Sequence, residues 1–292
     1  AEVSFTLPAS DLHETLAVAR DAAHAIGAQG VTHDPDVAKV SVVGLGMRTH
    51  VGVAAKMFNA LAEVGINIQM ITTSEIKISV LVSRAEGPEA LRAVHQAFEL
   101  DRAPEDATTP FSPSGLAQGK PDLASSVEAV PAVTVDGAGM EDLVVSGVEL
   151  DEDQALVTIW NVPDQPGYAA KVFDWIARSG INVDMIVQNV SHAGLTNLSF
   201  TIPKNQAAQA EQAVRQIGLG KVHVDVAFAK LSVLGIGMRS HTGVANRMFG
   251  ALAEKAINIA MINTSEVRIN VATAMGQGEL GLACLKRAFD LQ

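Results

Sequence analysis

The sequence predicts an α+β protein built from repeated ferredoxin-like units, each with the element order βαββαβ. Two observations support this prediction. Residues 40–80 recur as residues 231–271, and the two segments agree at 26 of 41 positions without a gap. A more distant copy at residues 155–186 aligns with residues 38–71 once two residues are removed from a loop. A repeated unit of this kind indicates tandem domains.

The third copy shows the elements of the unit in order. Residues 155–160 alternate as a strand does, and a turn rich in Pro and Gly follows. Apolar residues recur at helical spacing over residues 168–178, and Gly180 is the expected helix stop. The remaining elements are expected to be strands at 181–187, 198–202 and 222–228 and a second helix at 205–217.

These patterns divide the chain into units and one linker. Residues 1–37 predict a strand, a helix and a strand, which form the C-terminal half of a unit. Residues 38–103 are a complete unit, and residues 104–142 are rich in Pro and Gly and are expected to be a linker. Residues 143–229 are a unit preceded by an extra strand at 144–150, and residues 230–292 are the last unit.

Composition narrows the classes of partner. The chain has 292 residues, 48% hydrophobic residues and a net charge of −11, which argues against nucleic acid and anionic membranes as partners. It contains no apolar run long enough to span a bilayer. Cys284 is the only cysteine, which fits a reducing compartment and a cytoplasmic location, and it lies in a helical apolar pattern typical of core.

Polar residues that recur in loops are the candidate site. The glycine-rich loop 44–52 precedes a helix, whose free N–H groups attract an anion such as a carboxylate; glycine needed only for packing is the alternative. The Thr-Ser-Glu groups at 73–75 and 264–266 suit an ammonium, or they cap a turn locally. Asp164 is either an ordinary N-cap or a partner for a cation.

Catalytic and metal-binding constellations are not evident in the sequence. His50 and His241 occupy matching loops, but no His/Cys cluster accompanies them, so we expect hydrogen bonding within the loop. The loop spacing is not GxGxxG and lacks the P-loop lysine, which disfavours a nucleotide site.

The motifs GMRTHVGVAAKMF, GINIQMITTSEIKISV and PDQPGYAAKVF resemble the ACT-domain regulatory region of aspartate kinases, of the type with four ACT domains. The resemblance covers nearly all of the chain except the linker, and it implies antiparallel sheets that pair side by side. It implies lysine and/or threonine as feedback inhibitors of aspartate phosphorylation, in the route to lysine, threonine and methionine. It also implies a partner kinase domain preceding this region, which alone uses ATP and Mg, no cofactor in this chain, and a homo-oligomer formed through ACT sheets.

The resemblance also assigns effector contacts. Residues 38–103 and 230–292 are named the first and second GMR units, and residues 143–229 the PDQPG unit. In the PDQPG unit the contacts fall on Asp164, Gly167, Ala169, Gln188 and Ser191. In the first GMR unit they fall on Met47, Asn67, Ile68, Ser74 and Glu75, and in the second on Met238, Asn258, Ile259, Ser265 and Glu266.

Each site is expected to draw on one unit of each type. The first GMR unit is expected to lack its PDQPG partner in this chain, because residues 1–37 supply only half of a unit. Val51 and Thr242 replace a proline that is common in the family. Two other functions remain open: a dimerisation module with vestigial sites, and a regulatory subunit of another amino-acid enzyme, which the close match of the GMR and TSE stretches disfavours.

Overall fold

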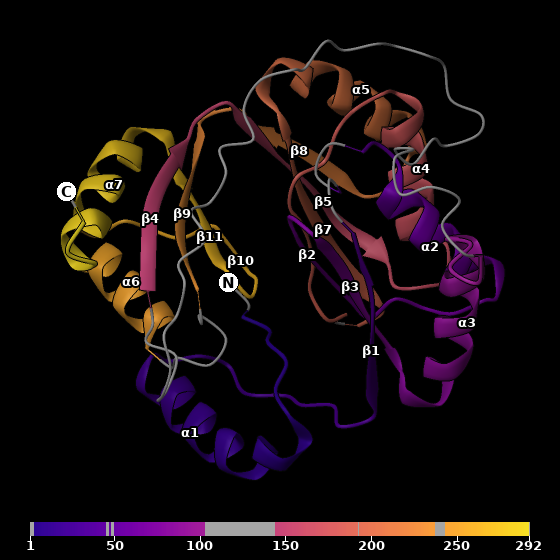
Figure 1. Cartoon of the computed structure of the whole chain (residues 1–292), viewed down its shortest axis with the longest axis horizontal. Coiled ribbons are helices and arrows are strands. Elements are labelled where there is room, and N and C mark those ends of the chain that lie inside the picture. Colours follow the sequence, from indigo (N-terminus) through magenta and orange to yellow (C-terminus); the bar gives the residue numbers. More distant parts are fainter. Residues whose placement is uncertain are drawn as a thin grey trace.

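The structure is a computed structural model, and it describes residues 3–44, 47, 50–102, 144–191, 193–236 and 243–291. Within these residues the chain forms a seven-stranded and a four-stranded sheet, each with helices on its outer face (Figure 1). All described strand pairs are antiparallel. The predicted α+β class is therefore confirmed, while the linker predicted at 104–142 lies outside the described residues.

The seven-stranded sheet joins the first GMR unit to the PDQPG unit, side by side. The first GMR unit contributes β1 (Val37–Val43), α2 (Val53–Glu63), β2 (Met70–Ser74), β3 (Lys77–Ser83) and α3 (Gly87–Ala97). The PDQPG unit contributes β5 (Gln154–Pro163), α4 (Tyr168–Arg178), β6 (Ile186–Gln188), β7 (Leu195–Pro203), α5 (Ala207–Ile217) and β8 (Lys221–Asp225). The strand order is β1-β3-β2-β6-β7-β5-β8, and the two units meet where β2 pairs with β6.

This pairing corrects the expectation that the first GMR unit lacks a PDQPG partner in the chain. Among the described residues, it is the second GMR unit that has none. Phe58 in α2 packs against the PDQPG unit and is only 1% exposed. Its counterpart Phe249 in the second GMR unit is only partly buried. The connection explains the choice: β8 lies at the opposite edge from β6, and residues 226–227 alone separate it from the second GMR unit, too few to reach β6.

The four-stranded sheet belongs to the second GMR unit, with one strand supplied from further up the chain. Its elements are β9 (Phe228–Ile236), α6 (Val244–Ala253), β10 (Met261–Thr264), β11 (Arg268–Ala274) and α7 (Gly278–Ala288). Strand β4 (Val144–Asp151) pairs with β9, giving the order β10-β11-β9-β4. The strand expected at 144–150 therefore exists, but it completes the second GMR unit instead of extending the PDQPG unit.

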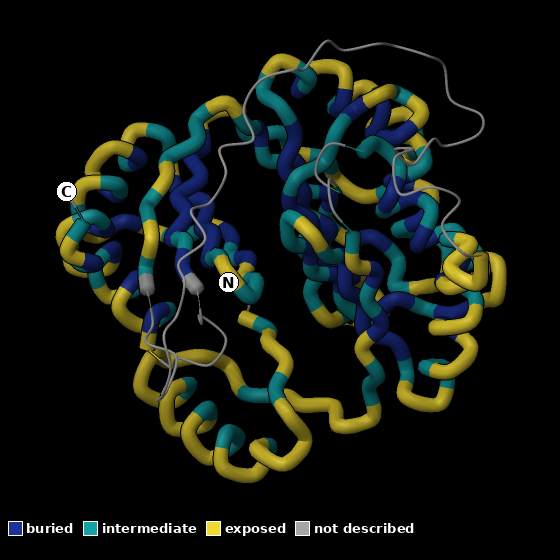
Figure 2. The backbone as a smooth tube through the Cα atoms, viewed as in Figure 1, coloured by how far each residue is buried: buried dark blue, intermediate teal, exposed yellow. Residues whose placement is uncertain are grey.

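The first residues form only part of what the pattern predicts. Helix α1 (Leu12–Ala25) is present, but residues 3–36 contain no strand, and no residue of α1 is buried (Figure 2). A strand needs a neighbouring strand to satisfy its backbone groups. The described residues provide no edge to which this segment is joined, so the expected strand–helix–strand half-unit reduces to its helix.

One hydrophobic core runs through both units of the seven-stranded sheet. Phe58 of α2 packs edge-to-face against Phe173 of α4, with ring centroids 5.3 Å apart, and Phe173 packs in the same way against Phe200 of β7. All three rings are at most 2% exposed. The contact between the two units is thus core packing, which fixes the position of the loops at their boundary.

The two sheets face each other through their uncovered faces (Figure 1). Met185 and Phe228 form a small cluster there with Met261 and Ala272. Asn263 lies on the same face of β10 as Met261, is 3% exposed, and has no hydrogen-bond partner for either side-chain atom among the described residues.

A buried amide that makes no hydrogen bond destabilises the folded state, so replacing it should help. We expect Asn263→Val to raise the free energy of unfolding by about 1 kcal/mol, since it removes the desolvation cost and favours a strand. Urea denaturation measures the change. Asn270→Val is the matched control and should destabilise, because the Asn270 side-chain oxygen accepts a 2.7 Å hydrogen bond from Ser232.

Candidate functional site

The junction between β2 and β6 relates the first GMR unit to the PDQPG unit in an approximately two-fold manner. Gly52 precedes α2 with φ +93°, and a Cβ built on it would lie 3.8 Å from the Cβ of Ala177 at the end of α4. Gly167 precedes α4 with φ +88°, and its Cβ would lie 3.8 Å from that of Ala62 at the end of α2. Each helix therefore begins beside the end of the other, and a pocket forms at each of the two places.

The Asp164 pocket lies at the start of α4. The Asn67 side-chain amide donates a 2.9 Å hydrogen bond to Asp164 Oδ1, across the boundary between the units. Gln188 is 4% exposed, and its amide donates to the backbone oxygen of Ile68 at 2.8 Å. No side chain caps the first turn of α4. Side chains of both units thus meet in front of free helical N–H groups.

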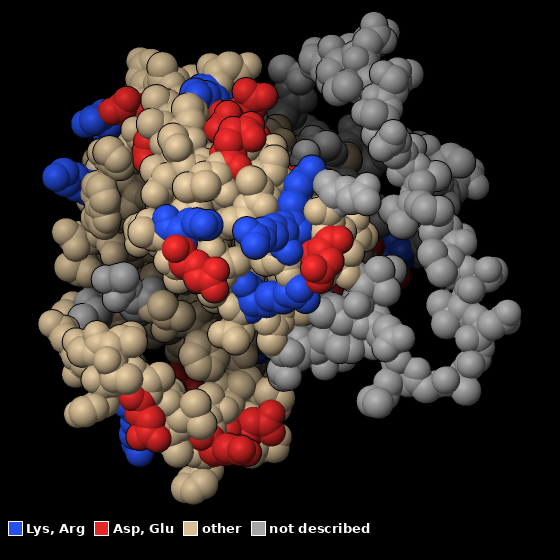
Figure 3. Space-filling model, turned by 90° about the vertical axis from the view of Figure 1, so that its left-hand side faces the viewer, with Lys and Arg blue, Asp and Glu red and all other residues tan. Residues whose placement is uncertain are grey.

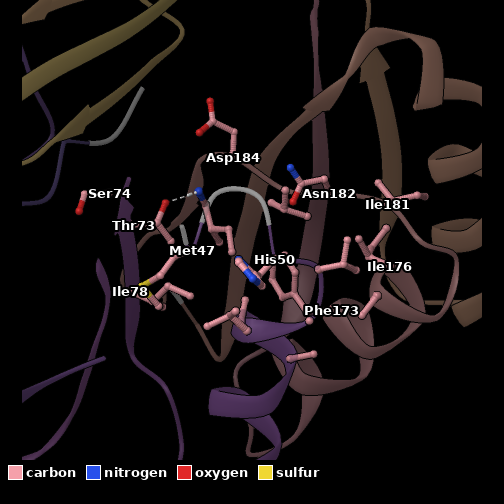
Figure 4. Close-up of a pocket in the computed structure, with 18 residues that line it drawn as sticks. Met47, His50, Thr73, Ser74, Ile78, Phe173, Ile176, Ile181, Asn182 and Asp184 are labelled. Atoms are coloured by element: carbon pink, nitrogen blue, oxygen red, sulfur yellow. Dashed lines mark hydrogen bonds between the residues drawn. The ribbon is translucent and has the colours of Figure 1, made fainter. Parts of the chain in front are cut away.

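The Asp184 pocket lies at the start of α2. The first GMR unit lines it with Met47, His50, Gly52, Thr73 and Ser74, and the PDQPG unit lines it with Asn182, Val183 and Asp184 (Figure 4). Thr73 Oγ1 accepts a 2.8 Å hydrogen bond from the Ile186 backbone N–H. The hydroxyl of Ser74 is buried and has no partner among the described residues. Such a group in the wall of a pocket is a candidate ligand contact.

The strand expected at 181–187 begins only at Ile186. Residues 181–184 instead line the Asp184 pocket, just as residues 66–68 line the Asp164 pocket. The Asp184 backbone N–H still bonds to Thr201 O at 3.0 Å, so the segment is held in place. This segment forms part of the pocket wall together with Met47, His50 and Gly52 of the neighbouring unit.

Eight of the predicted effector residues lie at these pockets. Asp164, Gly167, Ala169, Gln188, Asn67 and Ile68 line the Asp164 pocket, and Met47 and Ser74 line the Asp184 pocket. Ser191 and Glu75 line neither of them. Asn258, Ile259, Ser265 and Glu266 lie in the second GMR unit, away from both pockets, and Met238 lies outside the described residues.

The residues that line the Asp184 pocket without having been predicted as contacts include three consecutive ones of the PDQPG unit. Asn182, Val183 and Asp184 occupy the positions that Asn67, Ile68 and Gln69 occupy in the first GMR unit, counted from the shared Gly-Ile-Asn. The signal was therefore present in the alignment of the two copies. Carrying the assignment of Asn67 and Ile68 across that alignment would have found two of them.

The carboxylates expected to hold a ligand ammonium have other partners in the structure. Glu75 Oε1 lies 3.0 Å from Arg268 Nε, and Glu266 forms an ion pair with Lys77. Both contacts link the first GMR unit to the second. The structure therefore places these two glutamates at the contact between the GMR units, beside the sites that the resemblance implied.

Other chemistries find no support among the described residues. They contain no cluster of His, Cys, Asp and Glu able to hold a metal ion. Burial raises the pKa of the Cys284 thiol, which disfavours the nucleophilic thiolate.

None of the helices among the described residues has the length and apolar content that crossing a bilayer requires. On the face formed by the second GMR unit, charges of both signs are interspersed (Figure 3).

Comparison with known proteins identifies the family of the repeated units. The family model described as ACT domain matches residues 40–98, 160–217 and 231–289. The aspartate kinase of Pseudomonas putida is 44% identical over 164 residues, covering 54% of this chain and 40% of that protein. The aspartokinase of Helicobacter pylori is 43% identical over 157 residues, covering 53% of this chain and 39% of that protein.

A solved structure matches nearly the whole chain. The aspartate kinase from Synechocystis superposes with a TM-score of 0.76 and 31% identity, covering 97% of this chain and 46% of that one. The chain thus corresponds to less than half the length of each of these relatives.

Proposed function

This chain belongs to the ACT domain family, in the group found in aspartate kinases, and we propose that it is a regulatory region that binds lysine, threonine or both. The observation that supports the proposal most directly is the pair of related pockets between the first GMR unit and the PDQPG unit. Each pocket combines the free start of a helix with polar side chains from the opposite unit.

The two ends of a free amino acid fit this combination. Helix N–H groups and the helix dipole favour an α-carboxylate, and the glycines before α2 and α4 let it approach the backbone. Asp164 in one pocket and Asp184 in the other supply a negative charge for the ammonium group. The unpartnered hydroxyl of Ser74 offers a further hydrogen bond. Both pockets are therefore suited to a zwitterion.

A ligand at the boundary of two units also suits regulation. Its contacts depend on how the units sit against each other, so it favours the arrangement that it binds best. In the whole protein, that preference would be transmitted to a kinase domain that phosphorylates aspartate. Assembly into a homo-oligomer through ACT sheets belongs to the same proposal.

Calorimetric titration of the chain with lysine and with threonine tests the proposal. We expect saturable heat with at least one of them at submillimolar to millimolar concentration, and none with acetate or methylamine, each of which carries only one end of the zwitterion. Absence of heat with either amino acid up to several millimolar would contradict the proposal.

A second candidate function is assembly alone, with sites that no longer bind. The observation that favours it is the outer edge of β1, which has no neighbouring strand among the described residues, whereas the related strand β9 carries β4. Light scattering with and without the amino acids separates the two functions. Self-association together with the absence of binding heat would favour this second one.

A further inference from the structure

The second GMR unit is attached to one wall of the Asp184 pocket by a buried ion pair. Asp184 Oδ2 lies 2.5 Å from Nζ of Lys230, which belongs to β9. The Lys230 side chain is 6% exposed and the Asp184 side chain 12%. Asp151 of β4 lies 3.3 Å from the same ammonium. The same residue, Asp184, therefore lines the pocket and also holds the neighbouring unit through its carboxylate.

A second connection leaves the opposite wall. Ser74 lines the Asp184 pocket, and the next residue, Glu75, pairs with Arg268 of β11. Lys77, at the start of β3, pairs with Glu266. Because Glu266 and Arg268 are the repeat counterparts of Glu75 and Lys77, two related turns bind each other reciprocally. The pocket is thus tied to the second GMR unit at both of its walls.

The Asp164 pocket has no such connection. All of its lining residues belong to the first GMR unit and the PDQPG unit. Within the described part of the chain, no Lys or Arg lies within ion-pair distance of Asp164. The two pockets are related by the local two-fold, yet they differ in how they meet the rest of the molecule.

We propose that the Asp184 pocket, and not the Asp164 pocket, is coupled to the docking of the second GMR unit through competition between a ligand ammonium and Lys230 for Asp184. This inference rests on the proposed function, since it needs an amino acid in that pocket. Two cations beside one carboxylate repel each other, so a bound ammonium weakens the hold on Lys230. Coupling is reciprocal, so the ion pair with Lys230 lowers the affinity of the pocket for the ligand by the same factor by which the ligand weakens docking.

Removing the competing cation tests this coupling. In an Asp164→Asn background, which leaves the Asp184 pocket intact, we expect Lys230→Met to raise the affinity for lysine or threonine by about 5-fold or more. Arg268→Gln removes the cation of the more accessible ion pair with Glu75, and we expect it to raise the affinity by a smaller factor. This variant replaces Lys230→Met as the test if Lys230→Met does not fold. Lys39→Met, at an exposed position of β1, is the matched control and should leave affinity unchanged.

The position of the second GMR unit can be measured directly. Trp160 and Trp175, the only tryptophans, lie in the PDQPG unit. An acceptor dye can be placed at an exposed position in the middle of α7 with Ala283→Cys in a Cys284→Ser chain. We expect saturating lysine or threonine to change energy transfer from tryptophan to the dye in this labelled chain. The same change is expected when the labelled chain also carries Asp164→Asn. With Lys230→Met added, transfer should already be altered before ligand is present and should respond little to it.

The outcomes separate this inference from the proposed function. If neither amino acid gives heat with the parent chain, the proposed function fails. If heat is observed but folded Lys230→Met and Arg268→Gln bind with unchanged or lower affinity, the coupling is wrong. It is also wrong if energy transfer stays constant on saturation, or if Asp164→Asn abolishes the change in transfer.

Discussion

Replacing Phe58 by alanine is expected to lower the free energy of unfolding by about 3–5 kcal/mol, the range for deleting a fully buried aromatic ring. Phe58 is 1% exposed and packs on Phe173 of the neighbouring unit, so its loss leaves a cavity in the core that both units share. Urea denaturation, followed by circular dichroism, measures the change. A loss of this size is a large part of the stability of a typical domain.

The repeat supplies a matched control for this substitution. Phe249 is the counterpart of Phe58, but it lies on α6, which has no PDQPG unit against it among the described residues, and it is only partly buried. Phe249→Ala should cost about 1 kcal/mol, since less apolar area is lost. Equal losses for the two variants would contradict the side-by-side pairing in which Phe58 is core.

Local structure was predictable because it depends on neighbours in sequence. Helix α4 has the bounds 168–178 that its apolar spacing predicts, and Gly180 follows it with φ +67°. Gly52, Gly167 and Gly243 each precede a helix with positive φ, which explains the glycine at the same place in all three copies. These features are set within a few residues, and the repeat displays them three times.

The pairing of units was not predictable from the same pattern. Strands β2 and β10 have nearly the same sequence, yet only β2 pairs with β6. Edge strands join through backbone groups, which every residue except proline carries, so side-chain patterns do not select the partner. The lengths of the connections select it, and the two-residue link between β8 and β9 excludes the neighbouring unit.

The candidate site was predictable only in part for the same reason. Asp164, Asn67 and Gln188 are recognisable as polar residues at element ends, but their contact depends on which units meet. Glu75 and Glu266 have the same sequence signature, and the structure gives them cations of the opposite GMR unit as partners. A carboxylate near a turn therefore indicates a charge partner without identifying it.

Asp164→Asn is expected to weaken amino-acid binding at the Asp164 pocket by about 10–100-fold, because a hydrogen bond to a charged group contributes about 1.5–3 kcal/mol. The substitution keeps the size of the side chain and an oxygen able to accept from Asn67, as Asp164 Oδ1 does at 2.9 Å. It removes the charge that attracts the ligand ammonium. Calorimetry should show the loss of one set of sites and the persistence of the other, at the Asp184 pocket.

The same charge removal elsewhere provides the control. Asp153 is exposed in the turn between β4 and β5, so Asp153→Asn should leave both affinities unchanged. Comparing the two variants separates a local contact from the general effect of reducing a net charge of −11. If both variants weaken binding equally, the long-range field is responsible, and if neither does, Asp164 does not contact the ligand. Loss confined to Asp164→Asn locates the ligand ammonium beside Asp164. The ligand carboxylate then lies next to it at the start of α4, where the helix dipole favours a negative charge.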